Sequence, residues 1–119
     1  MKLDQPLSAR YQSLLHEVKE THDLLTAQLS ALDRTVSNIY HELERLDLTI
    51  TSGYYAALQL QDTLRRRRVV KDELDGVRGV LETMREAQDT LNQRLKKSEK
   101  RSVRWRRELN ITLQIEDVM

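Results

Sequence analysis

The 119-residue sequence contains no cysteine, which excludes disulfides, thiol catalysis and zinc sites built on thiolates. Aromatic residues are scarce, with one tryptophan, four tyrosines and no phenylalanine. One proline and three glycines are too few for the many turns of a β-sandwich or barrel. These scarcities favour an elongated, mainly α-helical protein whose Leu, Ile and Val side chains pack along narrow seams.

Long apolar runs are also missing. No stretch approaches the roughly 18 consecutive apolar residues of a membrane-spanning helix. Residues 1–6 lack the apolar run of a secretory signal. We therefore expect one domain over residues 1–119, located in the cytoplasm and without a membrane partner.

Charge is distributed unevenly, although the net charge is only +1. Residues 1–64 carry five basic and nine acidic side chains, residues 65–107 carry fifteen basic and seven acidic ones, and residues 108–119 carry three acids and no base. An anionic partner would therefore meet a basic middle region.

The first half of the chain has a sharp apolar periodicity. Alternating steps of four and three residues connect twelve positions, all apolar or aromatic except the histidine: Tyr11, Leu15, Val18, His22, Leu25, Leu29, Leu32, Val36, Ile39, Leu43, Leu46 and Ile50. An average spacing of 3.5 residues keeps one stripe facing a partner helix, as in a coiled coil. Pro6 and Ser8 are typical of a helix entry, and residues 51–53 (Thr-Ser-Gly) of an exit, which predicts a helix over about residues 7–51.

The second half repeats this rhythm at eight positions: Val70, Leu74, Val77, Leu81, Met84, Gln88, Leu91 and Leu95. Before them, a dense apolar patch over residues 54–64 does not share the later phase cleanly. Gly76 and Gly79 each cost about 1 kcal/mol against alanine in a helix, but the rhythm continues across them. We expect a second helix over about residues 54–98, antiparallel to the first across a corner at Gly53.

The C-terminal tail has a different period. Apolar and polar residues alternate from Val103 to Glu116, except at Arg107, which is typical of a half-buried strand over about residues 103–116. A lone strand leaves its backbone groups unpaired, so its expected partner is the same tail of another copy, which predicts a homo-oligomer. A helical end of the chain is the competing interpretation.

Two basic clusters are candidate anion sites. Residues 65–68 are four successive arginines followed by Lys71. They can form a solvated face paired with acids, or they can bind phosphate, which a guanidinium contacts in bidentate fashion. The second cluster, residues 94–107, holds eight basic residues against the single acid Glu99. Within it, Trp105 offers a flat face for a base or a cation, or anchors the tail on the helices.

No pattern of catalytic or metal-binding residues is recognisable. His22 lies on the seam, where a polar residue sets register more often than it binds a metal. No HExxH run, triad, carboxylate pair or phosphate-binding glycine loop occurs. We expect no enzymatic activity, no metal and no cofactor.

Three segments resemble a known family. They are residues 39–44 (Ile-Tyr-His-Glu-Leu-Glu), residues 53–55 (Gly-Tyr-Tyr) and residues 64–74, which place an Arg-Arg pair two residues before a Lys-Asp-Glu. Over about residues 30–75 the chain is similar to the phage-encoded anti-Thoeris sponge family, whose members sequester a cyclic ADP-ribose signal.

The resemblance implies a phage protein in the bacterial host cell that counters antiviral defence by binding a small phosphorylated nucleotide between subunits, without turnover. The matching positions are Arg67, Arg68 and Lys71. Trp105, Arg106 and Arg107 are further candidate ligands because of their chemistry, not because of a motif.

Two alternative functions stay open. In one, the hairpin is a coiled-coil structural or adaptor protein of a phage or prophage that binds a protein partner, such as a host protein. In the other, residues 94–107 bind nucleic acid, although the acidic first half would lie beside the second helix and offset part of the field.

Overall fold

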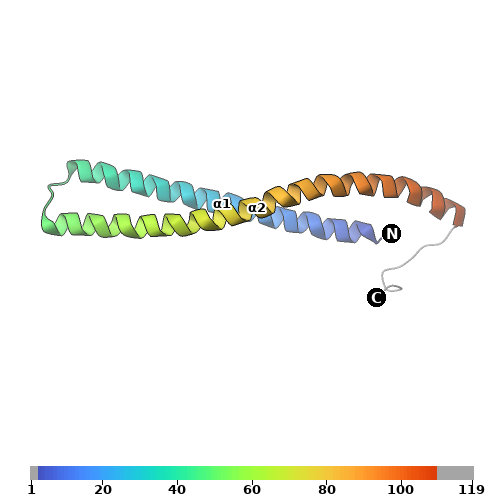
Figure 1. Ribbon diagram of the computed structural model, residues 1–119, viewed down its shortest axis with the longest axis horizontal. Coiled ribbons are helices and arrows are strands. Elements are labelled where there is room, and N and C mark those ends of the chain that lie inside the picture. The colour runs from blue at the N-terminus through green and yellow to red at the C-terminus, as the bar shows by residue number, and fades with distance from the viewer. Residues whose placement is uncertain (1–2, 110–119) are drawn as a thin grey trace. The chain divides into compact units, whose positions relative to one another are not determined.

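The structure is a computed structural model that describes residues 3–109, and it consists of two α-helices (Figure 1). Helix α1 comprises Asp4–Arg45 and helix α2 comprises Ile50–Leu109, with residues 46–49 connecting them. The described residues contain no strand. The predicted helical hairpin is therefore confirmed, although both helices begin earlier than expected, α1 ends earlier and α2 ends later.

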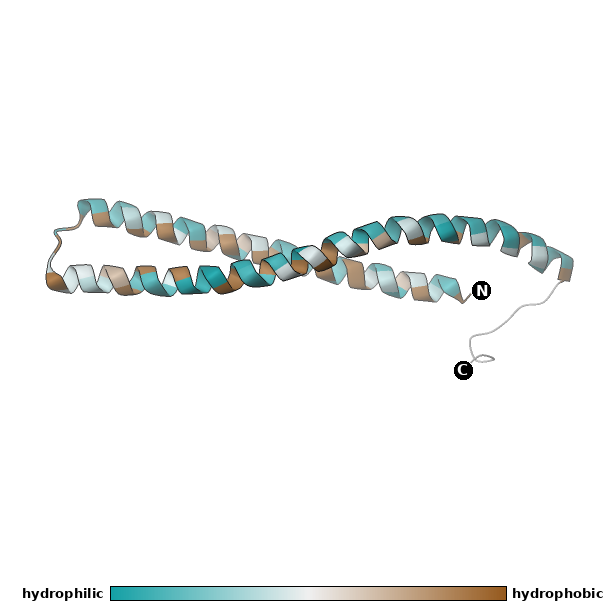
Figure 2. Cartoon of the chain, in the orientation of Figure 1, coloured by the Kyte–Doolittle hydropathy of each residue, from teal (hydrophilic) through white to brown (hydrophobic). Residues whose placement is uncertain are grey.

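The chain divides into two compact units. The tip unit is Glu20–Gly79 and contains the connection between the helices. The terminal unit is Met1–Lys19 together with Val80–Met119. In each unit, hydrophobic residues recur at intervals along the stretch of α1 and the stretch of α2 (Figure 2).

The seam of α1 follows the predicted phase. All ten predicted positions from Tyr11 to Leu43 are less exposed than their neighbours, and Ile39 is buried. In the terminal unit, the Tyr11 hydroxyl donates a hydrogen bond of 2.9 Å to the backbone oxygen of Met84. Leu46 and Ile50 do not continue the seam, because α1 ends at Arg45 and both side chains are exposed.

The seam of α2 confirms the eight predicted positions and extends further toward the N-terminus. Leu74 and Leu81 are buried, each with 2% of its surface exposed. The same phase continues backward through Leu60, Thr63 and Arg67. The buried Thr63 hydroxyl donates to the backbone oxygen of Gln59 at 2.8 Å, which satisfies it inside the seam. Because Thr63 and Arg67 are polar, the apolar periodicity of the sequence did not show that they belong to the seam.

The corner of the hairpin differs from the prediction. Thr49 and Ser52 cap the start of α2 reciprocally: the Ser52 amide donates to Thr49 Oγ1 at 3.1 Å, and the Thr49 amide donates to Ser52 Oγ at 2.9 Å. The Gly53 amide donates to the Thr49 carbonyl at 2.9 Å. Residues 51–53 thus form a helix entry with a capping-box arrangement, and the predicted exit at these residues is wrong.

Helix α2 continues without interruption through Gly76 and Gly79, which confirms the prediction for this segment. It also continues to Leu109, so the predicted strand is wrong over residues 103–109. The three-four rhythm persists there through Ser98 and Ser102, whose small polar side chains concealed it. Residues 110–116 of the predicted strand lie outside the described residues, and the described part of the tail gives no support to strand pairing between copies.

Candidate interaction surfaces

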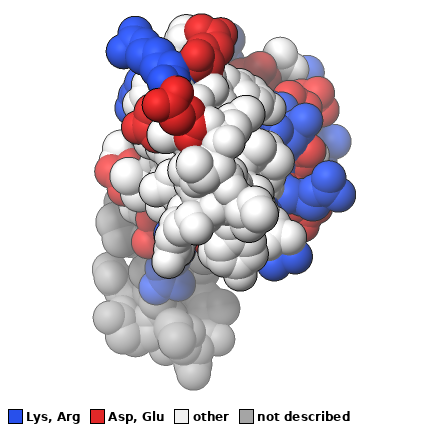
Figure 3. Space-filling model, turned by 90° about the vertical axis from the view of Figure 1, so that its left-hand side faces the viewer, with Lys and Arg blue, Asp and Glu red and all other residues white. Residues whose placement is uncertain are grey.

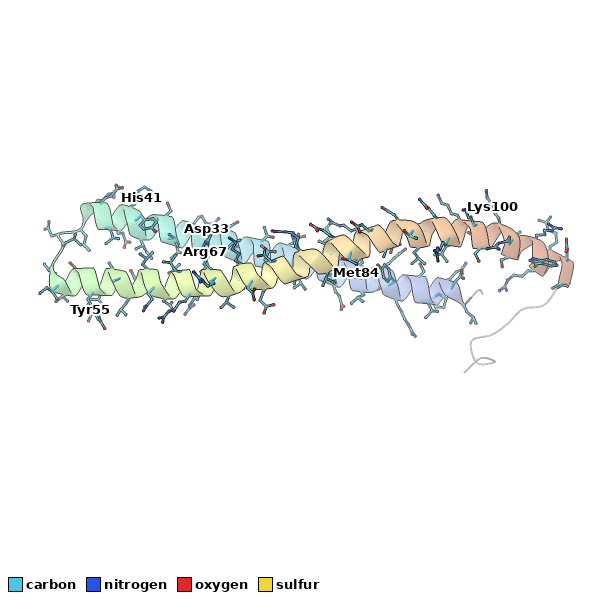
Figure 4. All side chains as sticks on the ribbon, in the orientation of Figure 1. Asp33, His41, Tyr55, Arg67, Met84 and Lys100 are labelled. Carbon is cyan, nitrogen blue, oxygen red and sulfur yellow. The ribbon has the colours of Figure 1, made fainter. Side chains whose placement is uncertain are left out.

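The predicted anion ligand Arg67 is engaged across the hairpin of the tip unit. Its Nε lies 2.6 Å from Asp33 Oδ1 of α1, and the two side chains are 36% and 51% exposed (Figure 4). Arg67 occupies a seam position, where a polar residue with a single matched partner specifies the register of the two helices. The structure therefore gives Arg67 an interaction that the sequence did not reveal.

Arg68 and Lys71 are exposed on α2. Close to them, a groove of about 560 Å³ has a mainly apolar lining: Gln28, Ala31, Leu32, Arg65, Arg66, Val69 and Val70. Arg66 also pairs with Asp62 at 3.0 Å, one helical turn earlier. None of the three predicted ligands Arg67, Arg68 and Lys71 lines this groove.

The other three predicted ligands lie in the terminal unit: Trp105, Arg106 and Arg107. Trp105 is 54% exposed, and the Arg104 guanidinium lies 5.9 Å from the centroid of its ring. Arg106 Nε donates to Ser102 Oγ at 3.1 Å, whereas Arg107 is exposed. These contacts place Arg106 beside the seam and leave Arg107 available to a ligand.

The most concentrated charge lies on the outer side of α2 in the terminal unit. At 100° per residue, six exposed side chains fall within a sector of about 140°, opposite the seam. We call them the basic face: Lys96, Lys97, Lys100, Arg101, Arg104 and Arg107. Within the described residues, its one ion pair joins Arg104 to Glu108, at 3.4 Å.

The end of the hairpin carries an exposed uncharged surface that the sequence analysis did not recognise. Residues 48–61 contain no charged side chain. We call the exposed apolar residues around the corner the tip patch: Leu46, Leu48, Ile50, Tyr54, Tyr55 and Leu58. Ile50 is 95% exposed, and the rings of Tyr54 and Tyr55 meet edge to face at 6.0 Å. Viewed from this end, uncharged surface occupies the centre, with charged side chains around it (Figure 3).

One signal in the sequence could have indicated the tip patch. In a chain with 33% charged residues, a run of fourteen uncharged residues is unusual. From the sequence, residues 54–64 are only a dense apolar patch that does not share the later phase cleanly. The structure separates its members, since Leu60 lies on the seam while Tyr54, Tyr55 and Leu58 are exposed.

In the part of the chain that the structure describes, the histidines and carboxylates do not form a metal-binding site. His22 Nδ1 lies 3.2 Å from Asp23 Oδ1, on the partly exposed seam of α1. Residues 3–109 hold no group of three or more His, Cys, Asp or Glu side chains that could bind a metal ion. Neither helix, over these residues, is long and apolar enough to cross a membrane.

Comparison with known proteins adds no further constraint, because no family model, curated protein or solved structure matches the chain. The resemblance to the anti-Thoeris sponge family therefore stays a prediction from short segments of sequence.

Proposed function

We propose that this protein is a non-enzymatic coiled-coil assembly protein that binds a second copy of itself through the tip patch. The supporting observation is the exposure of six large apolar side chains around one uncharged corner. Contiguous exposed apolar patches of more than a few hundred Å² commonly mark interaction sites. At the exposed fractions found here, the tip patch offers on the order of 700–900 Å², about the area that each partner contributes to a standard interface.

A second copy fits this surface better than a lipid bilayer does. Charged side chains of both signs surround the tip patch (Figure 3): Glu42, Glu44, Asp47 and Asp62 share this stretch of chain with Arg45, and Arg65 follows three residues after Asp62. A rim of mixed sign lacks the cluster of basic residues that attracts anionic lipids. Two tip patches related by a twofold axis bury their uncharged centres against each other and leave the charged rims in solvent.

This proposal changes the basis of the predicted homo-oligomer. The expected contact was a strand formed by residues 103–116, and its described part is helical. The tip patch supplies a different reason for self-association, one that rests on burial of apolar surface.

Sequestration of a cyclic ADP-ribose type nucleotide, a phage origin and a role against antiviral defence stay predictions of the resemblance. The geometry favours them less, because Arg67 already contacts Asp33, and Arg68 and Lys71 lie outside the neighbouring groove. A partner of another kind, such as a host protein, also stays a prediction.

Sedimentation equilibrium at low and high salt tests the proposal. We expect a reversible dimer whose dissociation constant changes little with salt, because the buried contacts are uncharged and salt does not screen them. A protein that stays monomeric at every concentration would contradict the proposal. Association that weakens with salt would also contradict it, since that dependence indicates an acidic surface of one copy meeting a basic surface of another.

A further inference from the structure

We propose that the basic face of α2 binds the phosphates of nucleic acid without reading base sequence. Its six lysines and arginines are all exposed, and their one ion pair within the described residues is the Arg104–Glu108 contact at 3.4 Å. Such a concentration of like charge is relieved by counterions, and releasing those counterions is the main source of affinity for a nucleic-acid backbone.

The dimensions of the face suit a linear polyanion. From Lys96 to Arg107 the helix rises about 16 Å, at 1.5 Å per residue. A duplex presents one phosphate per strand every 3.4 Å or so, which amounts to about five base pairs along this length. Lysine and arginine side chains are long enough to follow such a row of phosphates from a straight helix.

A small nucleotide fits the same surface less well. The neighbouring hollow, of about 500 Å³, is lined by Lys96, Glu99, Lys100 and Val103. Glu99 would repel a phosphate placed there, and Val103 donates no hydrogen bond. The other four basic side chains do not line this hollow; they lie on the outer side of the helix, where they can contact an extended ligand but cannot surround a compact one.

The neighbouring stretch of α1 does not cancel this charge. Within the terminal unit, residues 4–19 carry two acids, Asp4 and Glu17, and two bases, Arg10 and Lys19. Seven of the nine acidic residues among positions 1–64 belong to the tip unit. The sequence analysis predicts that the acidic first half of the chain weakens nucleic-acid binding. Residues 4–19, the part of that half in the terminal unit, are neutral overall, so they weaken the field of the basic face little.

Fluorescence anisotropy with the full chain and a labelled DNA duplex of arbitrary sequence tests the proposal. The variant Lys97→Gln/Arg101→Gln/Arg104→Gln removes three charges from the basic face and keeps good helix formers. Each lost phosphate contact lowers the salt slope of log K by about 0.9, so we expect a slope smaller by roughly 2.7 and binding weaker by about 100-fold or more at ~0.1 M salt.

The matched control is Arg34→Gln/Arg65→Gln/Arg85→Gln. It removes the same charge from exposed positions outside residues 96–107, and we expect its affinity to stay within a few-fold of the wild type. Circular dichroism of both variants establishes that the helices persist. Equal weakening by the two variants would overturn the proposal, because only the overall charge would then matter.

Two further ligands complete the experiment. A single strand bound more tightly than the duplex, with the difference lost in Trp105→Ala, would still support a phosphate site and would identify the single strand as its ligand. Failure to bind either nucleic acid would overturn the proposal. Equal binding of an acidic polypeptide such as polyglutamate would overturn it as well, because it would assign the face to protein partners.

Discussion

Leu74→Asp is expected to unfold the hairpin or to lower its stability by about 4 kcal/mol or more. Leu74 is 2% exposed, so the substitution removes a well-packed side chain and places an unpaired carboxylate in the seam. Stabilities of single domains are about 5–15 kcal/mol, so this loss is a large part of the total. Thermal unfolding followed by far-UV circular dichroism should show a melting temperature lower by tens of degrees, or no folded baseline.

Val69→Asp is the matched control for this substitution. Val69 lies on the same helix but is 63% exposed, and its replacement should change the stability by about 0.5 kcal/mol or less. If both substitutions lower the melting temperature equally, the seam of α2 is assigned to the wrong face.

Leu48→Ser/Ile50→Ser/Tyr55→Ser is expected to abolish self-association while leaving the hairpin folded. All three side chains are exposed members of the tip patch, so their loss removes little that holds the two helices together. Burying a large apolar side chain contributes about 1.5–3 kcal/mol, and each residue counts twice in a symmetric dimer. Even a fraction of that free energy raises the dissociation constant by at least about 100-fold, which sedimentation equilibrium measures directly.

The control for the tip variant is Leu7→Ser/Leu14→Ser/Leu24→Ser. It exchanges three exposed leucines of α1 for serine at positions away from the corner. Its dissociation constant should match that of the wild type. Loss of dimer in the control but not in the tip variant would move the interface from the corner to the side of α1.

The seam was predictable because it depends on spacing alone. The positions from Tyr11 to Leu43 and from Val70 to Leu95 follow from one rule about helices that pack side by side. The same rule failed where polar residues occupy the seam. Thr63 is satisfied by the backbone of its own helix and Arg67 by Asp33, and neither partner can be inferred from periodicity.

The helix ends and the interaction surfaces were harder to predict, for different physical reasons. Residues 51–53 have the composition of either a helix exit or a helix entry, and the reciprocal bonds between Thr49 and Ser52 decide for the entry. The alternation after residue 103 imitates a strand, although the helix continues through it to Leu109. Whether the tip-patch residues are exposed depends on where α1 ends. The sequence did not predict that end correctly, so their exposure could not be predicted from it.

The most direct test of the central claim, self-association through the tip patch, measures distances between spin labels on two copies. The chain has no cysteine, so Thr51→Cys and Leu24→Cys each give one labelled site, and both positions are exposed in the tip unit. We expect a short distance between the labels at residue 51 and a much longer one at residue 24. The opposite order, or no defined distance between copies at residue 51, would contradict the claim.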